Sequence, residues 1–379
     1  MKCAKYLRLA GGVCVLLTAA ALTGCGGGGS SNLPPPAKPE ILYGTGFNQI
    51  LGLKVNSTTG AVSPATITPG PNTSLGTTQM IATDPGKFLF VYDTEGQAID
   101  VFAINLDTTA LTAVGSPVST GAIGPAGGLA LDPSGKFLYV AGAAAIEVFS
   151  INSTSGALTP AGSPSIDNNG PYGLLATGKF LYASEIGNGS TATISGFSVN
   201  PSTGSLTPVP ASPVSTAVNG FPFFLAAHPS GKFLYAGFLT ANTLAAWTID
   251  GATGALTPTP GFPIALGIGT GSFISSVVVA PQGKFLYVCD DLGDVFGFAV
   301  NSSSGALTAM PGSPFPFLFT AQLFADPSGK FLYSPTGPFL AGFTVDATTG
   351  IPTPMGLLPF ALGQPLTVPA TLAFVKATP

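Results

Sequence analysis

The stretch of sequence that decides the fold is Gly127–Pro164, GGLALDPSGKFLYVAGAAAIEVFSINSTSGALTPAGSP. Two apolar runs, Gly128–Leu131 and Phe137–Ala141, are separated by an Asp-Pro-Ser-Gly sequence that is typical of a tight turn. Ile146–Ile151 then alternates apolar and polar residues, as a half-buried strand does. A polar turn leads into a fourth, more polar strand at Ala157–Thr159. The stretch therefore predicts four short antiparallel strands, which is one blade of a β-propeller.

This unit recurs along the chain at spacings of 43 to 53 residues. Versions of its Gly-Lys-Phe-Leu-Tyr segment stand at Gly86–Phe90, Gly135–Tyr139, Gly178–Tyr182, Gly231–Tyr235, Gly283–Tyr287 and Gly329–Tyr333. Repeats of this length indicate a propeller or a solenoid. A solenoid would need polar caps at both ends. Here the N-terminal copy starts at a second strand (Ile41–Tyr43), whereas Pro369–Val375 resembles a first strand with nothing after it.

The two incomplete ends make one whole blade if the chain closes into a ring. We therefore predict an all-β fold over residues 40–379, a seven-bladed β-propeller with four-stranded antiparallel blades. The C-terminal strand should close the ring by pairing with the N-terminal blade. A closed ring leaves no long sheet edge exposed, so we expect a monomer.

Composition agrees with this architecture and excludes some functions. The chain has 51 Gly, 36 Pro and only 7% charged residues, which is a turn-dense composition. Its net charge is −4 and it has no basic patch, so we expect no nucleic-acid partner.

The N-terminus predicts export. Three basic residues precede the apolar run Leu9–Leu22, which is too short for a stable membrane span. The run ends in Leu22-Thr23-Gly24-Cys25, which resembles a bacterial lipobox and implies cleavage before Cys25 and lipid attachment to its sulfur. An ordinary signal peptide with a chance Cys is the alternative. We predict a signal peptide at residues 1–24, a lipidated Cys25 with a flexible tether at residues 25–39, and a membrane partner through this anchor.

The expected location is the bacterial cell envelope. The residue after Cys25 is Gly rather than Asp, which favours the outer membrane if the host is Gram-negative. The sequence leaves open whether the protein faces the periplasm or the cell surface.

Antiparallel strand order sorts the loops into two faces. The turn face holds the first-to-second and third-to-fourth strand turns, including the Lys of each repeated Gly-Lys. The loop face holds the second-to-third loops and the links between blades, where propeller ligand sites usually lie. We can place no Lys or Arg on the loop face. Its candidate ligand-binding residues are Asp93, Glu95, Asp167, Glu185, Asp290, Asp291 and Asp294.

The densest acidic segment is Cys289–Asp294. Its three carboxylates, Asp290, Asp291 and Asp294, lie within five residues and could hold a divalent cation such as Ca²⁺. The spacing matches no EF-hand pattern. A solvated acidic loop that aids solubility is the alternative. We expect no other cofactor.

Several other residues have a structural interpretation. His228 is the only His and takes the place of an Asp in a tight turn, so we expect it to be structural. Cys289 should be a buried small residue, and Trp247 should pack between blades. The first strands should line the central channel with Thr78, Gln79, Tyr172, Phe223, Ser275, Ser276 and Gln322.

The repeated Pro-Ser-Gly-Lys-Phe-Leu-Tyr-Val, followed by a Thr-Gly-Ala-Leu-Thr-Pro turn, resembles the seven-bladed lactonase family. That family includes 6-phosphogluconolactonases and carboxymuconate cyclases, and it is related to the YVTN surface-protein repeats. The resemblance covers essentially the whole mature chain and implies the propeller fold. It also implies hydrolysis of anionic lactones by Arg, His and Glu around the channel. This chain departs from that pattern, because its only Arg is Arg8 in the signal peptide and His228 lies in a turn.

Because the family's site residues are missing, we expect first a non-catalytic, lipid-anchored propeller, a scaffold that binds a protein or small ligand through its acidic loop face. The alternative is a lactonase-like hydrolase acting on a neutral or cationic lactone, with Asp290, Asp294 or Glu185 as the base. A structural surface protein with no discrete site is a third possibility. The sequence assigns no catalytic residue.

Overall fold

The computed structural model describes residues 40–46, 49–69, 78–83, 85–93, 96–121, 128–142, 144–162, 165–166, 170–185, 192–269, 272–317, 322–336, 339–359 and 372–375. All of them belong to one compact unit, Lys38–Pro379. The predicted signal peptide and tether, residues 1–39, lie outside the described residues. Within the described ranges, no helix is long and apolar enough to span a membrane.

The unit is built from seven antiparallel sheets. Each is named here as a blade after its innermost strand. In chain order of their second strands, the β33 blade contains β1 (Glu40–Gly46), β2 (Gln49–Val55), β3 (Val62–Pro69) and β33 (Leu372–Val375). The β4 blade contains β4 (Thr78–Ala82), β5 (Phe88–Asp93), β6 (Ala98–Ile104), β7 (Leu111–Ala113) and β8 (Val118–Ser119). The β9 blade contains β9 (Leu129–Leu131), β10 (Phe137–Ala141), β11 (Ala145–Ile151), β12 (Leu158–Pro160) and β13 (Ser165–Ile166).

The β14 blade contains β14 (Pro171–Thr177), β15 (Phe180–Glu185), β16 (Thr193–Val199), β17 (Leu206–Pro208) and β18 (Val214–Ser215). The β19 blade contains β19 (Pro222–Ala227), β20 (Phe233–Phe238), β21 (Thr243–Ile249), β22 (Leu256–Pro258) and β23 (Ile264–Ala265). The β24 blade contains β24 (Ile274–Val279), β25 (Phe285–Asp290), β26 (Asp294–Val300), β27 (Leu307–Ala309) and β28 (Phe315–Pro316). The β29 blade contains β29 (Phe324–Ala325), β30 (Phe331–Thr336), β31 (Phe339–Val345) and β32 (Pro352–Pro359).

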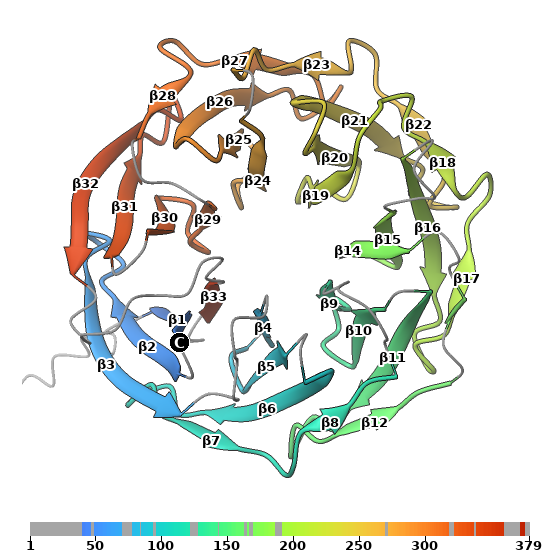
Figure 1. The fold of residues 1–379 in the computed structure, drawn as a ribbon, viewed down its shortest axis with the longest axis vertical. Helices are drawn as coiled ribbons and strands as arrows, with labels where there is room; N and C mark the ends of the chain where they lie inside the picture. Colours follow the sequence, from blue (N-terminus) through green and yellow to red (C-terminus); the bar gives the residue numbers. More distant parts are fainter. Residues whose placement is uncertain are drawn as a thin grey trace, which may run out of the picture. The chain divides into compact units, whose positions relative to one another are not determined.

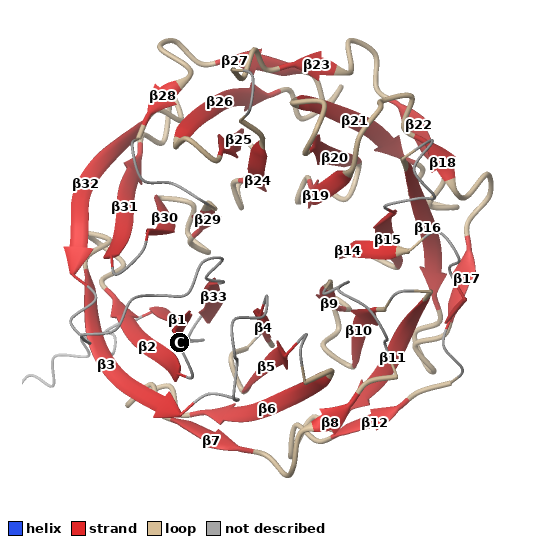
Figure 2. Ribbon diagram, viewed as in Figure 1, coloured by secondary structure: helices blue, strands red, loops and turns tan. Residues whose placement is uncertain are grey.

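The seven blades form a ring with the first strands nearest the centre and the fourth strands at the rim (Figure 1). Strands and loops make up the whole of the described chain (Figure 2). The ring closes as predicted, because β33 pairs antiparallel with β1 from Ile41 opposite Val375 to Gly44 opposite Leu372. The seven-bladed, all-β prediction is therefore confirmed.

The outer strand of five blades is interrupted. In the β4 blade, for example, β6 pairs first with β7 (Ile104 opposite Leu111) and then with β8 (Ala98 opposite Ser119). β7 and β8 together thus take the place of a single fourth strand. The β33 and β29 blades instead have continuous outer strands, β3 and β32, each with one register shift.

Apolar side chains fill the joints between neighbouring blades. Trp247 from β21 is almost fully buried in a cluster with Phe180 and Tyr182 from β15, so it packs between the β14 and β19 blades as expected. Burial of such large rings is the main stabilising term for a sheet stack of this kind.

A tyrosine latch ties each of six blades to the next. The repeat Tyr lies fully buried on the second strand and donates its hydroxyl to a backbone carbonyl in the third-to-fourth strand turn of the following blade. The pairs are Tyr43 with Thr109, Tyr139 with Gly204, Tyr182 with Gly254, Tyr235 with Gly305, Tyr287 with Gly350 and Tyr333 with Gly60, at 2.6 to 3.2 Å. The β4 blade has Phe90 at this position and makes no such bond.

The same turn explains why the repeat keeps Gly and Phe. Gly254 has a φ of +78°, and a Cβ there would lie 2.5 Å from Cδ1 of Phe180. Phe180 belongs to the Gly-Lys-Phe of the preceding blade. The two halves of the repeated motif are therefore contact partners across the joint between blades.

Candidate active site

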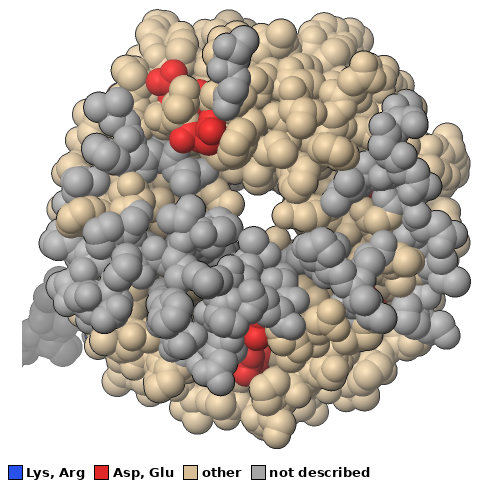
Figure 3. Space-filling model, viewed as in Figure 1, with Lys and Arg blue, Asp and Glu red and all other residues tan. Residues whose placement is uncertain are grey.

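The first strands line a central channel, which is open in the space-filling view (Figure 3). In three consecutive blades the pairing of the first strand with the second slips by one residue near its start. The slips fall between Pro171 and Leu174 in β14, between Pro222 and Phe224 in β19, and between Ile274 and Ser276 in β24. Such β-bulges re-aim side chains and are common beside active sites. They mark this side of the channel mouth on the loop face.

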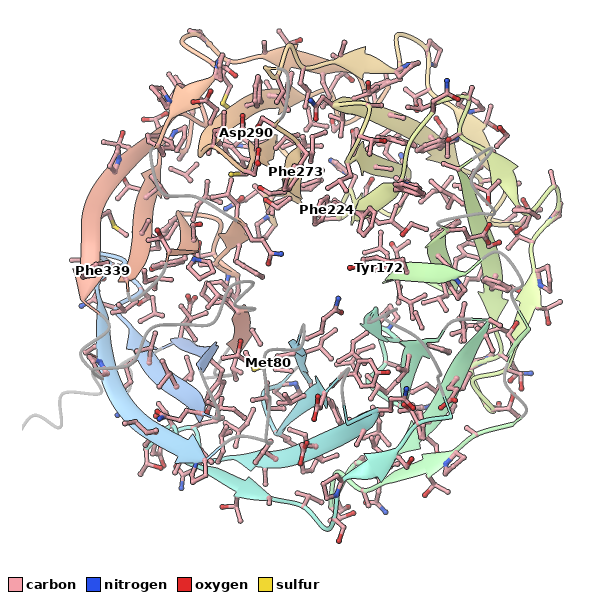
Figure 4. The ribbon with its side chains drawn as sticks, viewed as in Figure 1. Met80, Tyr172, Phe224, Phe273, Asp290 and Phe339 are labelled. Carbon is pink, nitrogen blue, oxygen red and sulfur yellow. The ribbon has the colours of Figure 1, made fainter. Side chains whose placement is uncertain are left out.

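Two of the bulges present aromatic rings. Tyr172 and Phe223 are partly buried, and their ring centroids lie 4.3 Å apart at an interplanar angle of 64°. Phe221 continues the series, with its centroid 6.0 Å from that of Phe223 and an angle of 87°. The Tyr172 hydroxyl points toward the channel (Figure 4). We call Tyr172, Phe221 and Phe223 the aromatic wall.

The third bulge residue, Ser275, is buried and turns into its own blade. Its Oγ donates to the carbonyl oxygens of Cys289 and Asp290, at 3.1 and 3.0 Å. Ser275 therefore fixes the end of β25, where Asp290 stands.

Other predicted channel residues connect neighbouring first strands. The Oγ of Ser276 accepts a hydrogen bond from the Leu323 amide, and Oε1 of Gln79 accepts one from the Leu129 amide, both at 3.0 Å. Gln322 is partly buried just before β29, and the side chain of Thr78 lies outside the described residues. Two of these residues therefore join adjacent blades at the channel.

Asp290 and Asp294 form a carboxyl pair at the loop between β25 and β26. Asp290 is only 1% exposed, and its Oδ1 accepts hydrogen bonds from the amides of Leu292 at 3.1 Å and Asp294 at 2.8 Å. Burial, and then the nearby Asp294 carboxylate, raise the pKa of Asp290. Asp294 is partly exposed.

Phe273 stands between this pair and the channel. It is 43% exposed, and Asp290, Phe273 and Phe224 follow one another inward toward the channel (Figure 4). The carboxyl pair belongs to the β24 blade and the aromatic wall to the β14 and β19 blades, so the two groups come from consecutive blades.

Asp291 ties three segments of this sector together. Its Oδ1 accepts hydrogen bonds from the Ser272 hydroxyl and, at 2.9 Å, from the Phe273 amide. Asn242, from the loop between β20 and β21, donates its Nδ2 to the Ser272 carbonyl at 2.8 Å. The Asp291 carboxylate therefore holds the loop of the β24 blade against the link that precedes it.

The structure does not gather Asp290, Asp291 and Asp294 into the calcium site that the sequence suggested. Asp290 and Asp291 direct carboxylate oxygens to N–H and O–H groups of their own surroundings. Throughout the described residues, no group of three or more His, Cys, Asp or Glu side chains could hold a metal ion.

The remaining acidic candidates are dispersed. Glu185, at the end of β15, is fully buried, and its two oxygens accept hydrogen bonds from the hydroxyls of Thr193 and Ser195 on β16. Asp93 is buried at the end of β5. Glu95 and Asp167 lie outside the described residues. Glu185 is therefore enclosed by its own blade rather than offered to a ligand.

The face seen in Figure 3 agrees with the predicted charge of the loop face. Acidic side chains appear over β5 and β6 and over β25 and β26, and no described Lys or Arg is in view. Sequence reasoning missed two partly buried carboxyl groups, Asp100 on β6 and Glu147 on β11. Burial is the main cause that raises the pKa of each. Their only signal in the sequence was an acidic residue within a strand whose apolar and polar residues alternate.

His228 and Cys289 are structural, as expected. His228 is buried, its Nε2 donates to the Gly283 carbonyl at 2.9 Å, and its Nδ1 accepts from the Ser230 amide at 3.1 Å. Nδ1 thus stabilises the turn, and Nε2 joins the β19 blade to the β24 blade. Cys289 is fully buried beside the Asp290 carbonyl.

Comparison with known proteins identifies the class of this propeller. The family model described as "Lactonase, 7-bladed beta-propeller" matches residues 48–172 and 173–265, which is more than half of the chain. The chain belongs to this lactonase family.

Solved structures of similar proteins share the fold. A candidate 6-phosphogluconolactonase from Bacteroides fragilis is 23% identical with a TM-score of 0.73, over 90% of this chain and 99% of that one. A second candidate from Bacteroides uniformis is 19% identical with a TM-score of 0.68, over 89% and 100%. The periplasmic gluconolactonase of Pseudomonas aeruginosa is 17% identical with a TM-score of 0.73, over 90% and 99%. No curated protein matches the sequence.

The expectation of a non-catalytic scaffold is wrong. Membership in the lactonase family favours the alternative, a lactonase-like hydrolase, and neither the fold nor the comparisons support a scaffold role. The absence of the family's Arg and His residues does not exclude hydrolysis, because a lactone can be hydrolysed with a positioned base and a water molecule.

Proposed function

We propose that this protein hydrolyses a lactone at the mouth of its channel, in the sector formed by the β14, β19 and β24 blades. The observation that carries the proposal is the lactonase family match over more than half of the chain. The three bulges and the carboxyl pair support this location, since they lie together on the loop face.

The reaction needs a base and a water molecule. The carboxyl pair takes a proton from water as the water oxygen bonds to the lactone carbonyl carbon. The bond between that carbon and the ring oxygen then breaks, and the ring oxygen receives the proton, so that the product is a hydroxy acid. Asp294 is the partly exposed member of the pair and is the carboxylate that can reach the water, whereas the buried Asp290 accepts the Asp294 amide and fixes the loop.

Charge favours a substrate without a phosphate or carboxylate group. The only Arg of the sequence is Arg8, and the described repeat lysines Lys87, Lys136, Lys179, Lys232, Lys284 and Lys330 follow turns on the opposite face. A site that grips an anion wants an Arg fork or a Lys near it. Of the two activities in the names of similar structures, gluconolactone hydrolysis therefore fits this site better than hydrolysis of its 6-phosphate.

The test is to measure the hydrolysis of glucono-δ-lactone by pH-stat titration, which records the acid that the reaction releases. We expect Asp294→Asn to lower turnover by about 100-fold or more, the range of a lost general base, and Asp290→Asn to lower turnover less. The matched control is Asp346→Asn, which removes a carboxylate from an exposed turn on the opposite face and should leave turnover unchanged. Full activity of Asp294→Asn would disprove the assignment of the base.

We also propose that residues 1–24 are removed and that Cys25 carries the lipid anchor. The lipobox-like segment and the tether composition support this. Mass spectrometry of the N-terminal peptide from the membrane fraction should show a diacylglyceryl-modified Cys25. Cys25→Ala should move the protein to the soluble fraction, and its retention in the membrane would contradict the anchor.

A further inference from the structure

We propose that the aromatic wall is the subsite that binds the apolar ring face of the substrate. This inference rests on the proposed lactone hydrolysis. It goes further by assigning the recognition of the ring to Tyr172 and Phe223.

The first support is the backbone that presents these rings. Tyr172 and Phe223 occupy the bulges of two neighbouring first strands, and each bulge has its own hydrogen bond. The Gly173 amide donates to the Ser184 hydroxyl at 2.9 Å, and the Phe223 amide donates to the Phe221 carbonyl at 3.0 Å. The backbone that carries the rings is thus fixed before any ligand arrives, which lowers the entropy cost of binding.

The second support is the geometry of the two rings. At 4.3 Å and 64°, they meet edge to face and form a corner rather than a flat stack. Such a corner offers the face of one ring and the edge of the other to a small ring in the channel. Both side chains are only partly buried, whereas the repeat tyrosines on the second strands are fully buried in the joints between blades.

The third support is the polar character of the same mouth. The Tyr172 hydroxyl points toward the channel (Figure 4), and burial raises the pKa of Tyr172, so this hydroxyl stays protonated and able to donate. A sugar-like ring has C–H groups on its face and hydroxyl groups at its edge. It therefore matches an aromatic corner with a hydroxyl at its rim better than a wholly apolar ring does.

The test is binding of glucono-δ-lactam, a hydrolysis-resistant analogue of the lactone, to the purified protein. We would measure affinity by titration calorimetry, and contacts by saturation-transfer NMR with irradiation of the aromatic protons. We expect Phe223→Leu and Tyr172→Leu each to weaken binding by about tenfold or more and to reduce transfer to the C–H protons of the lactam ring. Tyr172→Phe keeps the ring and should retain most of the saturation transfer.

The matched control is Phe339→Leu. Phe339→Leu is the same substitution as Phe223→Leu, but Phe339 is 42% exposed and lies toward the outside of the β29 blade (Figure 4). Its replacement should change neither affinity nor transfer. Thermal unfolding of every variant shows whether the fold is kept.

Three outcomes would overturn the subsite. In the first, the wild type binds the lactam and both leucine variants bind it equally well. In the second, the wild type does not bind the lactam. The third is selective binding of choline, which would show that the rings recognise a cation. If the lactam binds through these rings but no lactone is hydrolysed, the subsite stands and the proposed catalytic function fails. If hydrolysis survives Asp294→Asn while the rings still bind the lactam, only the base is wrong.

Discussion

At the scale of single residues, Asp290 shows how burial gives a carboxyl group a different role from its neighbours. A group whose pKa is raised in the folded state holds its proton more tightly there than in the unfolded chain. Its contribution to the free energy of unfolding is thus fully present below the unfolded pKa and is lost as the pH rises through the folded pKa.

In Asp290→Asn the side chain cannot ionise, so this contribution to the free energy of unfolding is not lost as the pH rises. We expect the variant to gain stability relative to the parent as the pH rises from about 4, the unfolded Asp pKa, toward 7. Urea denaturation at several pH values checks this. Asp346 provides the contrast, because hydrogen bonds from the backbone of Thr349 lower its pKa, so that its charged form stabilises the fold above the unfolded pKa. A stability difference between Asp290→Asn and the parent that does not change with pH would contradict the assigned shift.

His228 gives a second residue-scale prediction. His228→Ala leaves the buried Gly283 carbonyl without the Nε2 donor, so we expect a loss of about 1–3 kcal/mol in the free energy of unfolding. Lactone turnover at saturating substrate should not change, because the ring serves a turn and a blade joint. A large fall in turnover with unchanged stability would instead indicate a catalytic role for His228.

At the scale of structural elements, the tyrosine latch is the recurring device. Tyr287→Phe removes the 2.6 Å bond to the Gly350 carbonyl while keeping the ring, and should cost about 1 kcal/mol of stability. Tyr172→Phe is the matched change on the channel wall and should leave the free energy of unfolding nearly unchanged. Chemical denaturation of both variants decides this, and equal effects of the two would argue against the latch.

The bulges are elements that sequence reasoning found only in part. The sequence predicts Tyr172, Phe223 and Ser275 on the channel-lining strands, because the first strand of each repeat is recognisable. Their place at slips of register was not predicted, since a slip depends on how two strands pair in space. The same limit explains why Ser275 was expected to line the channel yet hydrogen-bonds the end of β25.

At the scale of the whole molecule, ring closure is the critical contact. Deleting residues 372–379 removes β33 and exposes the edge of β1. We expect a clear fall in melting temperature and the appearance of oligomers in size-exclusion chromatography, because an unpaired edge recruits other strands. Deleting only residues 376–379 keeps β33 and should have little effect. Unchanged stability without β33 would show that the ring does not need this strand.

The sequence by itself determined the class of fold, because a repeated turn, a repeated strand and two incomplete ends leave a closed ring as the consistent solution. It also predicted a loop face without Lys or Arg side chains, and it favoured structural roles for His228, Cys289 and Trp247. Tertiary structure alone decided the burial and the hydrogen-bond partners of each carboxyl group. Asp290 and Glu185 both end second strands, yet one is paired with Asp294 and the other is enclosed by Thr193 and Ser195. The physical reason is that periodicity fixes which strand a residue occupies, whereas burial, register and hydrogen-bond partners depend on neighbours distant in the chain.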